Sequence, residues 1–175
     1  MDQLSILIQK AKKGDKEAYG QIYNLFYSRI FRFCKFNCPN DHIAQDICQE
    51  TFLKAWKSLP AFSTKGGSLQ AYLFKIARNL TVDFWRKKKT LSLTDHEDIP
   101  TIDNLEEKVD KQSNIEKVRK VLFMLKEDER QIIILRYFED LSQIEVAKAV
   151  GLREGNIRVK THRILQKLRG LLETA

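Results

Sequence analysis

Side chains suited to binding nucleic acid gather on one side of a predicted helix near the C-terminus. Arg158, His162 and Arg163 recur there at helical spacing, with the small apolar Val159 among them. At about 100° per residue, this set lies opposite the apolar residues of the same segment. A helix with such a face can contact both phosphates and base edges in a major groove. The pattern indicates a DNA-reading helix; the alternative is an ordinary solvated face in a helical bundle.

The residues before this helix predict a helix-turn-helix. Ser142 and Glu145 have the spacing of a capping box, in which each side chain satisfies a backbone donor of the starting helix. Leu141 and Val146 flank that cap as a hydrophobic staple. Gly151 can take the left-handed conformation that a tight exit needs. The inner face of the second helix is expected to consist of Ile157, Thr161, Ile164, Leu165, Leu168, Leu171 and Leu172.

A second basic stretch closes a helix predicted to run from Ser68 to about Lys89. Its last six residues read Phe-Trp-Arg-Lys-Lys-Lys, so four positive charges follow two aromatic rings. Such a run suits single-stranded nucleic acid, because cations track the backbone while planar groups stack on exposed bases. The alternative is that these cations only interact with the dipole at the helix C-terminus. Four in a row exceed that need.

The cysteines indicate neither a disulfide framework nor a metal site. Cys34, Cys38 and Cys48 are too few for a disulfide framework. Cys34, Cys38 and His42 are spaced to align three metal ligands on one helix, but Pro39 should break that helix and a structural zinc site takes four ligands. We interpret the cysteines as small core or loop residues and expect no metal and no cofactor. Nothing in the sequence assembles a nucleophile–base pair or a phosphate-cradling glycine loop, so we do not expect an enzyme.

The composition favours an anionic partner. Lys and Arg outnumber Asp and Glu by 31 to 23, which gives a net charge of +8 and a pI near 9.4. That charge suits nucleic acid or a membrane surface. No apolar run approaches the roughly 20 residues of a transmembrane span. The first residues lack the basic start and cleavage site of a signal peptide. We expect a cytoplasmic protein without membrane insertion.

Helical periodicity runs through nearly the whole chain, which contains three Pro and seven Gly, and predicts an all-α protein. The net charge changes along it, from +9 over residues 1–89 to −5 over 90–113 and +4 over 114–175. The sequence therefore predicts two small helical domains, 1–89 and 114–175, joined by an acidic linker, 90–113. We expect helices at about 4–13, 16–36, 41–59, 68–89, 114–125 and 127–137 before the helix-turn-helix, and a flexible loop at 63–67.

Two long stretches resemble one family, the extracytoplasmic-function (ECF) group of bacterial sigma factors in the sigma-70 family. In the first domain, DHIAQDICQETFLKAWKSLPAF and SLQAYLFKIARNLTVDFWRKKK resemble its core-binding and promoter-melting signature. In the second, LKEDERQIIILRYFEDLSQIEVAKAVGLREGNIRVKTHRILQKLR resembles its −35-reading domain. The resemblance implies a sigma factor that binds core RNA polymerase, directs it to a promoter subset and helps to melt DNA.

The resemblance also assigns residues to partners. The β′ clamp helices of polymerase would contact Asp46, Gln49, Glu50, Phe52, Leu53 and Trp56. The single-stranded −10 element would contact Phe62, Ser63, Lys65, Asn79, Asp83, Arg86, Lys87 and Lys88, with the loop at 62–68 capturing a flipped base. The −35 duplex would contact Arg153, Glu154, Asn156, Arg158, Val159, His162 and Arg163. The β flap and an anti-sigma factor are further expected partners.

The sequence departs from the family at Tyr72–Leu73, where a tryptophan is usual, and at Val159, where serine is common. Two rival interpretations stay open at this point. A free-standing regulator could bind duplex DNA through the helix-turn-helix, often as a dimer, but it would leave the 46–56 face and the 85–89 run unexplained. A sigma-like adaptor could occupy polymerase without starting transcription.

Overall fold

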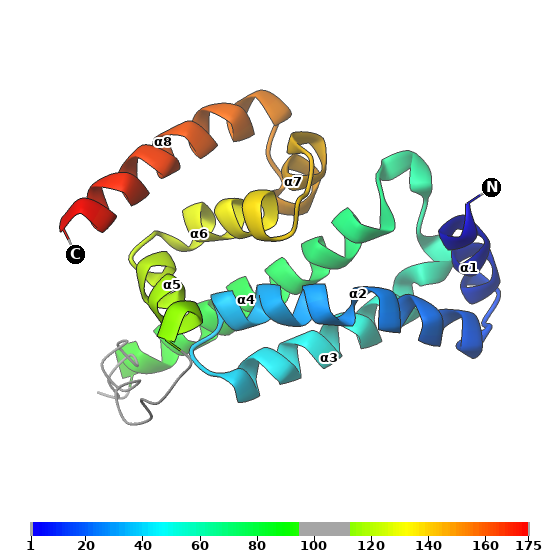
Figure 1. The fold of residues 1–175 in the computed structure, drawn as a ribbon. Helices are drawn as coiled ribbons and strands as arrows, with labels where there is room; N and C mark the ends of the chain where they lie inside the picture. Colours follow the sequence, from blue (N-terminus) through cyan, green and yellow to red (C-terminus); the bar gives the residue numbers. More distant parts are fainter. Residues whose placement is uncertain (1, 95–112, 175) are drawn as a thin grey trace.

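The computed structural model describes residues 2–94 and 113–174, and these contain helices and connections without any strand. The predicted all-α fold is confirmed. We call residues 2–94 the first half and residues 113–174 the second half. Figure 1 shows α4 running the length of the first half, with the second half lying across it. The longer helices are α1 (Gln3–Lys12), α2 (Lys16–Asn37), α3 (Asp41–Ser58), α4 (Leu69–Thr94), α5 (Ser113–Phe123), α6 (Glu127–Ile133), α7 (Gln143–Val150) and α8 (Glu154–Thr174).

Local capping residues set the starts of the helices in the first half. The carboxylate of Asp15 accepts hydrogen bonds from the backbone of Glu17 and Ala18, each at 3.0 Å, and so caps α2 as expected. Asn40 caps α3 in the same way through the backbone of Ile43 at 2.9 Å. The prediction that the helix ends before Pro39 is confirmed, because α2 stops at Asn37.

The connection from α3 to α4 is more regular than the sequence predicts. The 3₁₀ turn Leu59–Ala61 follows α3, and a second one, Thr64–Gly66, lies inside the predicted flexible loop. The hydroxyl of Ser63 caps this second turn by accepting from the backbone of Lys65. At its other end, α4 continues to Thr94 rather than ending near Lys89, because no Pro or Gly interrupts it.

The second half differs from the prediction just before the helix-turn-helix. The single helix expected at 127–137 is instead α6 followed by a π-helical turn, Ile134–Phe138. The backbone of Glu139 donates to the carbonyl of Ile134, and that of Leu141 to the carbonyl of Leu135. The wider turn changes the direction of the chain, so that Glu139 is buried just before the helix-turn-helix begins.

The inner face of α8 is shorter than predicted. Ile157, Thr161 and Ile164 are buried, whereas Leu165 and Leu172 are 41% and 61% exposed. The prediction that these two leucines belong to the inner face is wrong. Leu168 and Leu171 still pack partly against the core, and α8 contacts α5 and α6, so Leu165 and Leu172 lie at the edge of the packed stripe rather than within it.

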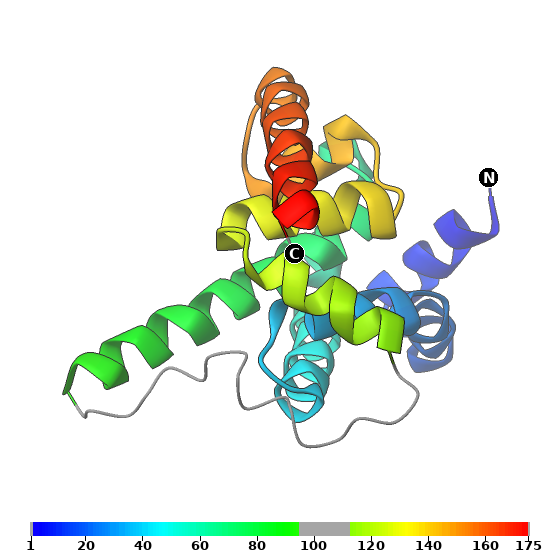
Figure 2. The same cartoon turned by 60° about the vertical axis from the view of Figure 1, so that its left-hand side comes forward.

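The two halves share one continuous core rather than standing apart. α4 packs on α7, and α2 packs on α5 and α6. Figure 2 shows α5 crossing α2 and α4, beneath α6 and α8. The buried hydrophobic residues of both halves form a single cluster, which runs from Leu7 on α1 to Ile164 on α8. Nothing in the sequence pattern predicts this close packing between the halves.

Candidate nucleic-acid interface

The predicted helix-turn-helix is present, with the expected local chemistry. The Ser142 hydroxyl accepts from the backbone of Glu145 at 3.3 Å, and the Glu145 carboxylate accepts from the backbone of Ser142 at 3.0 Å. Gly151 has a left-handed backbone with φ of 72° and ends α7. Leu141 and Val146 are fully buried beside the cap. The capping box and the glycine exit are therefore confirmed, and both residues of the predicted staple are buried.

The outward face of α8 is open to solvent. Arg158, His162 and Arg163 are exposed, and Val159 is 50% exposed at their centre. Arg153, Glu154 and Asn156, at the N-terminal end of the helix, are exposed as well. All seven residues assigned to −35 recognition are thus accessible, with Arg153 directly before α8 and the other six within it.

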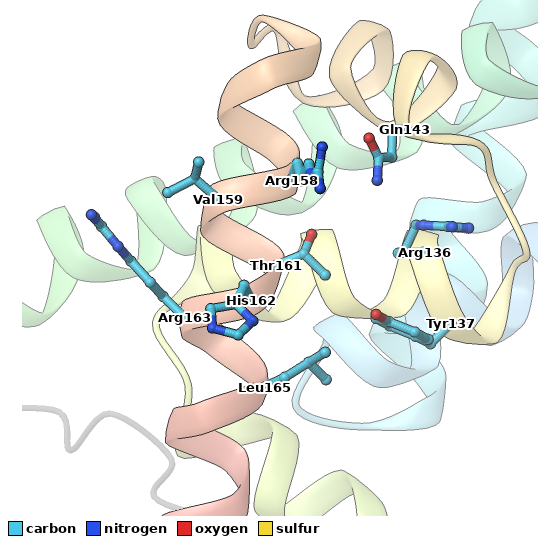
Figure 3. Close-up of a pocket in the computed structure, with 9 residues that line it drawn as sticks. All are labelled: Arg136, Tyr137, Gln143, Arg158, Val159, Thr161, His162, Arg163 and Leu165. Atoms are coloured by element: carbon cyan, nitrogen blue, oxygen red, sulfur yellow. The ribbon is translucent and has the colours of Figure 1, made fainter.

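A hollow of about 520 Å³ lies beside this face, between α8 and the segment before the helix-turn-helix. Arg136, Tyr137 and Gln143 form its far wall, opposite Arg158, Thr161, His162 and Leu165 (Figure 3). Sequence reasoning missed these three wall residues because they precede the predicted reading helix. The available signal was an Arg-Tyr pair at 136 and 137, shortly before the capping box. Arg136 also donates to the carbonyl of Leu141 at 3.0 Å and so fixes the start of the helix-turn-helix.

The residues assigned to −10 recognition fall into two groups. The Phe62 side chain is buried, with its ring centroid 4.9 Å from that of Tyr72, whereas Ser63 and Lys65 are exposed on the loop. The second group lies further along α4. Asn79 is exposed there, Asp83 pairs with Arg86 at 2.9 Å, and Lys87 faces solvent. The Lys88 ammonium lies 6.0 Å from the centroid of the Trp85 ring.

Trp85 does not have the role we expected from its place beside the basic run. Its indole N–H donates to the carbonyl of Asn37 at 2.8 Å, and its ring meets the edge of Phe123 on α5. The Phe84 ring packs against it at 5.3 Å. In this arrangement Trp85 joins α4 to α2 and α5, with Phe84 packed against it. The cations from Arg86 to Lys89 lie on the part of α4 that projects beyond the body (Figure 2).

The second half covers part of the surface that is assigned to −10 recognition. Arg78 on α4 donates to the Gln131 side chain on α6 at 3.0 Å, and it lies beside Asn79. The Ser68 hydroxyl donates to the Glu145 carboxylate on α7 at 2.7 Å. Gly67 lies so close to Lys148 that a Cβ built there would be 2.9 Å from the lysine Cδ. The end of the loop at 62–68 and the start of α4 are therefore in contact with the helix-turn-helix.

One carboxylate anchors this contact. Glu139 has a fully buried side chain that faces Arg29 and Arg32 on α2. Arg32 binds both carboxylate oxygens, at 2.6 and 2.9 Å, and Arg29 reaches one of them at 3.3 Å. Arg29 also donates to the Glu139 carbonyl. A buried carboxylate needs this paired, charge-assisted geometry to offset its desolvation.

The neighbouring part of the contact is also rich in arginine. Arg119 on α5 donates to the carbonyl of Cys38 at 2.5 Å, and Arg130 on α6 stacks 4.2 Å from the centroid of Phe123. Burial lowers the pKa of Arg130 to about 10 and raises the pKa of the Cys38 thiol to about 12. The Nε atom of Arg119 is buried without a hydrogen-bond partner among the described residues. An interface that buries cations and leaves a donor unsatisfied has a lower stability than an apolar core of equal area.

The residues assigned to polymerase divide into a surface and a core part. Asp46, Gln49, Glu50 and Leu53 are exposed along one side of α3. Trp56 is partly buried, with its ring centroid 4.8 Å from that of Tyr19. Phe52 is buried, with its ring centroid 4.6 Å from that of Tyr23, so in this arrangement it supports the surface from beneath.

All three cysteines are buried, as the sequence suggested. Within residues 2–94 and 113–174, no group of three or more His, Cys, Asp or Glu side chains is arranged to hold a metal ion. Among the same residues, no helix is long and apolar enough to cross a membrane.

Comparison with known proteins gives matches along most of the chain. The family model "Sigma-70 region 2" matches residues 22–90, and "Sigma-70, region 4" matches residues 121–170. The ECF RNA polymerase sigma factor SigW of Bacillus subtilis is 29% identical over 174 residues, which cover 93% of this chain and 92% of SigW.

Two solved structures have a similar fold. The sigma factor RpoE of Bartonella quintana, solved with the anti-sigma factor NepR, is 26% identical with a TM-score of 0.76, over 89% of this chain and 96% of RpoE. CnrH, solved with the cytosolic domain of CnrY, is 24% identical with a TM-score of 0.79, over 99% of both chains.

Proposed function

This chain belongs to the ECF group of the sigma-70 family, and we propose that its two halves divide promoter recognition between −10 and −35. It is a sigma factor, which binds core RNA polymerase and directs promoter-specific initiation rather than catalysing a reaction. In this proposal, residues 1–89 bind polymerase and open the −10 region, and residues 114–175 hold the −35 duplex. The observation that carries the assignment is the exposed basic face of α8, set on a capped helix-turn-helix within a region 4 match.

The −35 half would use α8 as its reading helix. Arg158, His162 and Arg163 project from it around Val159, which suits contact with base edges and flanking phosphates together. Arg153, Glu154 and Asn156 would meet the DNA at the N-terminal end of the helix.

The −10 half would use the loop after α3 and the outer side of α4. Ser63 and Lys65 are exposed on a loop anchored by the buried Phe62, which suits capture of an unstacked base. Asn79 and Asp83 would face the same strand. Arg86, Lys87 and Lys88 lie further along α4 and would hold its phosphates electrostatically.

We call the observed packing of the two halves on one core the closed arrangement. It is incompatible with reading the −10 and −35 elements at once. Centres at −10 and −35 are about 85 Å apart along B-form DNA, at about 3.4 Å per base pair. Yet α4 and α7 are in direct contact. Residues 95–112 are long enough to span at most about 60 Å when extended, so the halves can separate widely while they remain joined. We therefore infer that the halves separate before or during promoter binding.

Core polymerase would bind this chain before promoter DNA does. Its proposed contacts Asp46, Gln49, Glu50 and Leu53 are exposed while the halves are closed, whereas the start of α4 is covered by α7. The relative RpoE was solved bound to an anti-sigma factor. We propose a partner of that kind for this chain as well, and a cytoplasmic location where polymerase is found.

The test is transcription by purified core polymerase on a DNA library randomised at the −10 and −35 elements. We expect the complete chain to select templates with defined sequences at both elements and to start transcription downstream. A selection of −35 sequences by the free chain, without any polymerase-dependent start, would favour the free-standing regulator. Polymerase binding without selective transcription would favour the adaptor.

A further inference from the structure

The last residue of α1 contacts the loop that we assign to base capture. The ammonium group of Lys12 donates to the carbonyl oxygen of Phe62 at 2.6 Å, across fifty residues of sequence. Lys12 is half-buried, whereas the next residue, Lys13, is exposed. A lysine can reach solvent easily at a helix end, so its placement against a backbone carbonyl is specific.

α1 is built to hold Lys12 at this point. Leu7, Ile8 and Ala11 are buried on one side of the helix. Through them α1 packs on α2 and on the 3₁₀ turn Leu59–Ala61. Figure 1 shows α1 beside the connection between α3 and α4. The helix therefore lies next to the proposed capture loop.

Phe62 is the residue from which the exposed part of the loop starts. Its ring packs on Tyr72, and the Tyr72 hydroxyl is hydrogen-bonded to Ser58 at the end of α3. With its side chain held by Tyr72 and its carbonyl held by Lys12, Phe62 is fixed on two sides. The exposed residues Ser63, Thr64 and Lys65 follow at once. Their conformation depends on the backbone direction that leaves Phe62.

We propose that Lys12 is a positioning residue for −10 selectivity, which holds the Phe62 carbonyl so that Ser63–Lys65 present one conformation to the captured base. This inference rests on the proposed function, since it assumes that the loop meets the −10 strand. Lys12 acts through the loop and does not itself touch the base. A fixed loop discriminates between bases, because a wrong base then leaves its polar groups unpaired instead of being accommodated.

The test uses the complete chain with core polymerase on the library randomised at −10 and −35. Lys12→Met removes the donor and keeps the apolar stem, Lys12→Arg restores a donor, and Lys13→Met is the matched control. We expect Lys12→Met to lower base discrimination at −10 by roughly tenfold, the scale of one charge-assisted hydrogen bond, and to leave −35 discrimination unchanged. Lys12→Arg should recover −10 discrimination, and Lys13→Met should match the wild type.

Hydrogen exchange supplies a readout that does not depend on transcription. The backbone N–H groups of Phe62 and Gly66 donate to Leu59 and Ser63 within the loop, so their protection reports its order. We expect faster exchange there in Lys12→Met and wild-type exchange in Lys13→Met.

Three results would overturn the inference: unchanged −10 discrimination in Lys12→Met, an equal loss at −10 and −35, or no recovery in Lys12→Arg. Failure of the wild-type chain to select any promoter would instead overturn the proposed function.

Discussion

Arg32 and Glu139, 107 residues apart, form a bidentate ion pair in which the carboxylate is completely buried. Arg32 belongs to α2 in the first half, and Glu139 follows the π-helical turn that leads into the helix-turn-helix. The pair therefore joins the two halves at the point where the helix-turn-helix begins. In the proposed mechanism the halves separate to read −10 and −35, so this pair would break during initiation.

The first prediction concerns that pair. Glu139→Gln keeps the shape of the side chain but removes the charge that faces Arg29 and Arg32. We expect it to weaken the closed arrangement by about 1–3 kcal/mol, since the buried hydrogen bonds would no longer join two charged groups. X-ray scattering should show a larger radius of gyration. Emission from Trp85, recorded in a Trp56→Phe background, should shift to the red as its contact with Phe123 opens.

Glu154→Gln is the control for this prediction, because it removes the same charge from an exposed residue at the start of α8. It should leave both the radius and the emission unchanged. An unchanged radius and emission in Glu139→Gln would show that the ion pair does not hold the halves together.

A second prediction concerns pH. Burial by itself raises the pKa of Glu145, but hydrogen bonds from Ser68 and Ser142 outweigh that effect and hold the pKa below its ordinary value of 4.5. A carboxyl group whose pKa is lowered by folding stabilises the fold above its unfolded pKa, and that contribution disappears as the pH falls through the folded pKa. Glu145→Gln should lower the free energy of unfolding by about 1 kcal/mol at pH 7. The difference should shrink below pH 4.5.

Chemical denaturation across pH 3 to 7 measures this effect. Glu154→Gln, an exposed change in the first turn of α8, should show a much smaller difference. If the difference in free energy of unfolding between the wild type and Glu145→Gln stays constant with pH, the capping carboxylate is not its source.

The third prediction tests the reading face of α8. Arg158→Ala should weaken discrimination among −35 sequences by about 1–3 kcal/mol if the guanidinium makes a bidentate contact with a base. Arg169→Ala is the control, because Arg169 is exposed on the same helix and pairs with Glu173 near its end. Competition between −35 variants in transcription gives the measurement. An equal loss on all variants would assign Arg158 to the phosphates.

The fourth prediction concerns the projecting end of α4. Replacing Lys87, Lys88 and Lys89 with alanine should slow open-complex formation and flatten its salt dependence. For each single-strand phosphate that these lysines no longer neutralise, the log–log slope should fall by about 0.7. Replacing the exposed Lys13 and Lys16 should leave the slope unchanged, although it removes charge of the same sign. Wild-type melting kinetics in the triple variant would mean that the run is a solvated helix end.

The fifth prediction separates polymerase binding from stability. Leu53 is 47% exposed on α3, and Leu25 is 58% exposed on α2. Leu53→Glu should reduce affinity for core polymerase by at least about tenfold, the scale of an apolar interface anchor. Leu25→Glu should not reduce it. The melting temperature of both variants should stay near that of the wild type, because neither side chain is buried. Equal affinities for the two variants would move the polymerase site away from α3.

The local features of the helix-turn-helix could be predicted because they depend on residues a few positions apart. The cap of Ser142 with Glu145, the turn at Gly151 and the opposite faces of α8 all follow from helical geometry and backbone donors near a helix end. The same holds for Asp15 at the start of α2. Hydrophobic periodicity predicts the inner face of one helix, but it does not predict which other helices cover that face. It could not tell that Leu165 and Leu172, at the edge of the apolar stripe of α8, stay exposed.

The sequence by itself thus determined the all-α class, the order of the helices and the outward basic face of the helix-turn-helix, because each depends on short-range pattern. The tertiary structure alone decided which distant residues meet. It sets Glu139 against Arg32, turns Trp85 from the basic run to Phe123, and brings Lys12 to the Phe62 carbonyl. Those contacts depend on how whole helices pack, since a charge or an aromatic ring on one helix has no local signal for its partner on another.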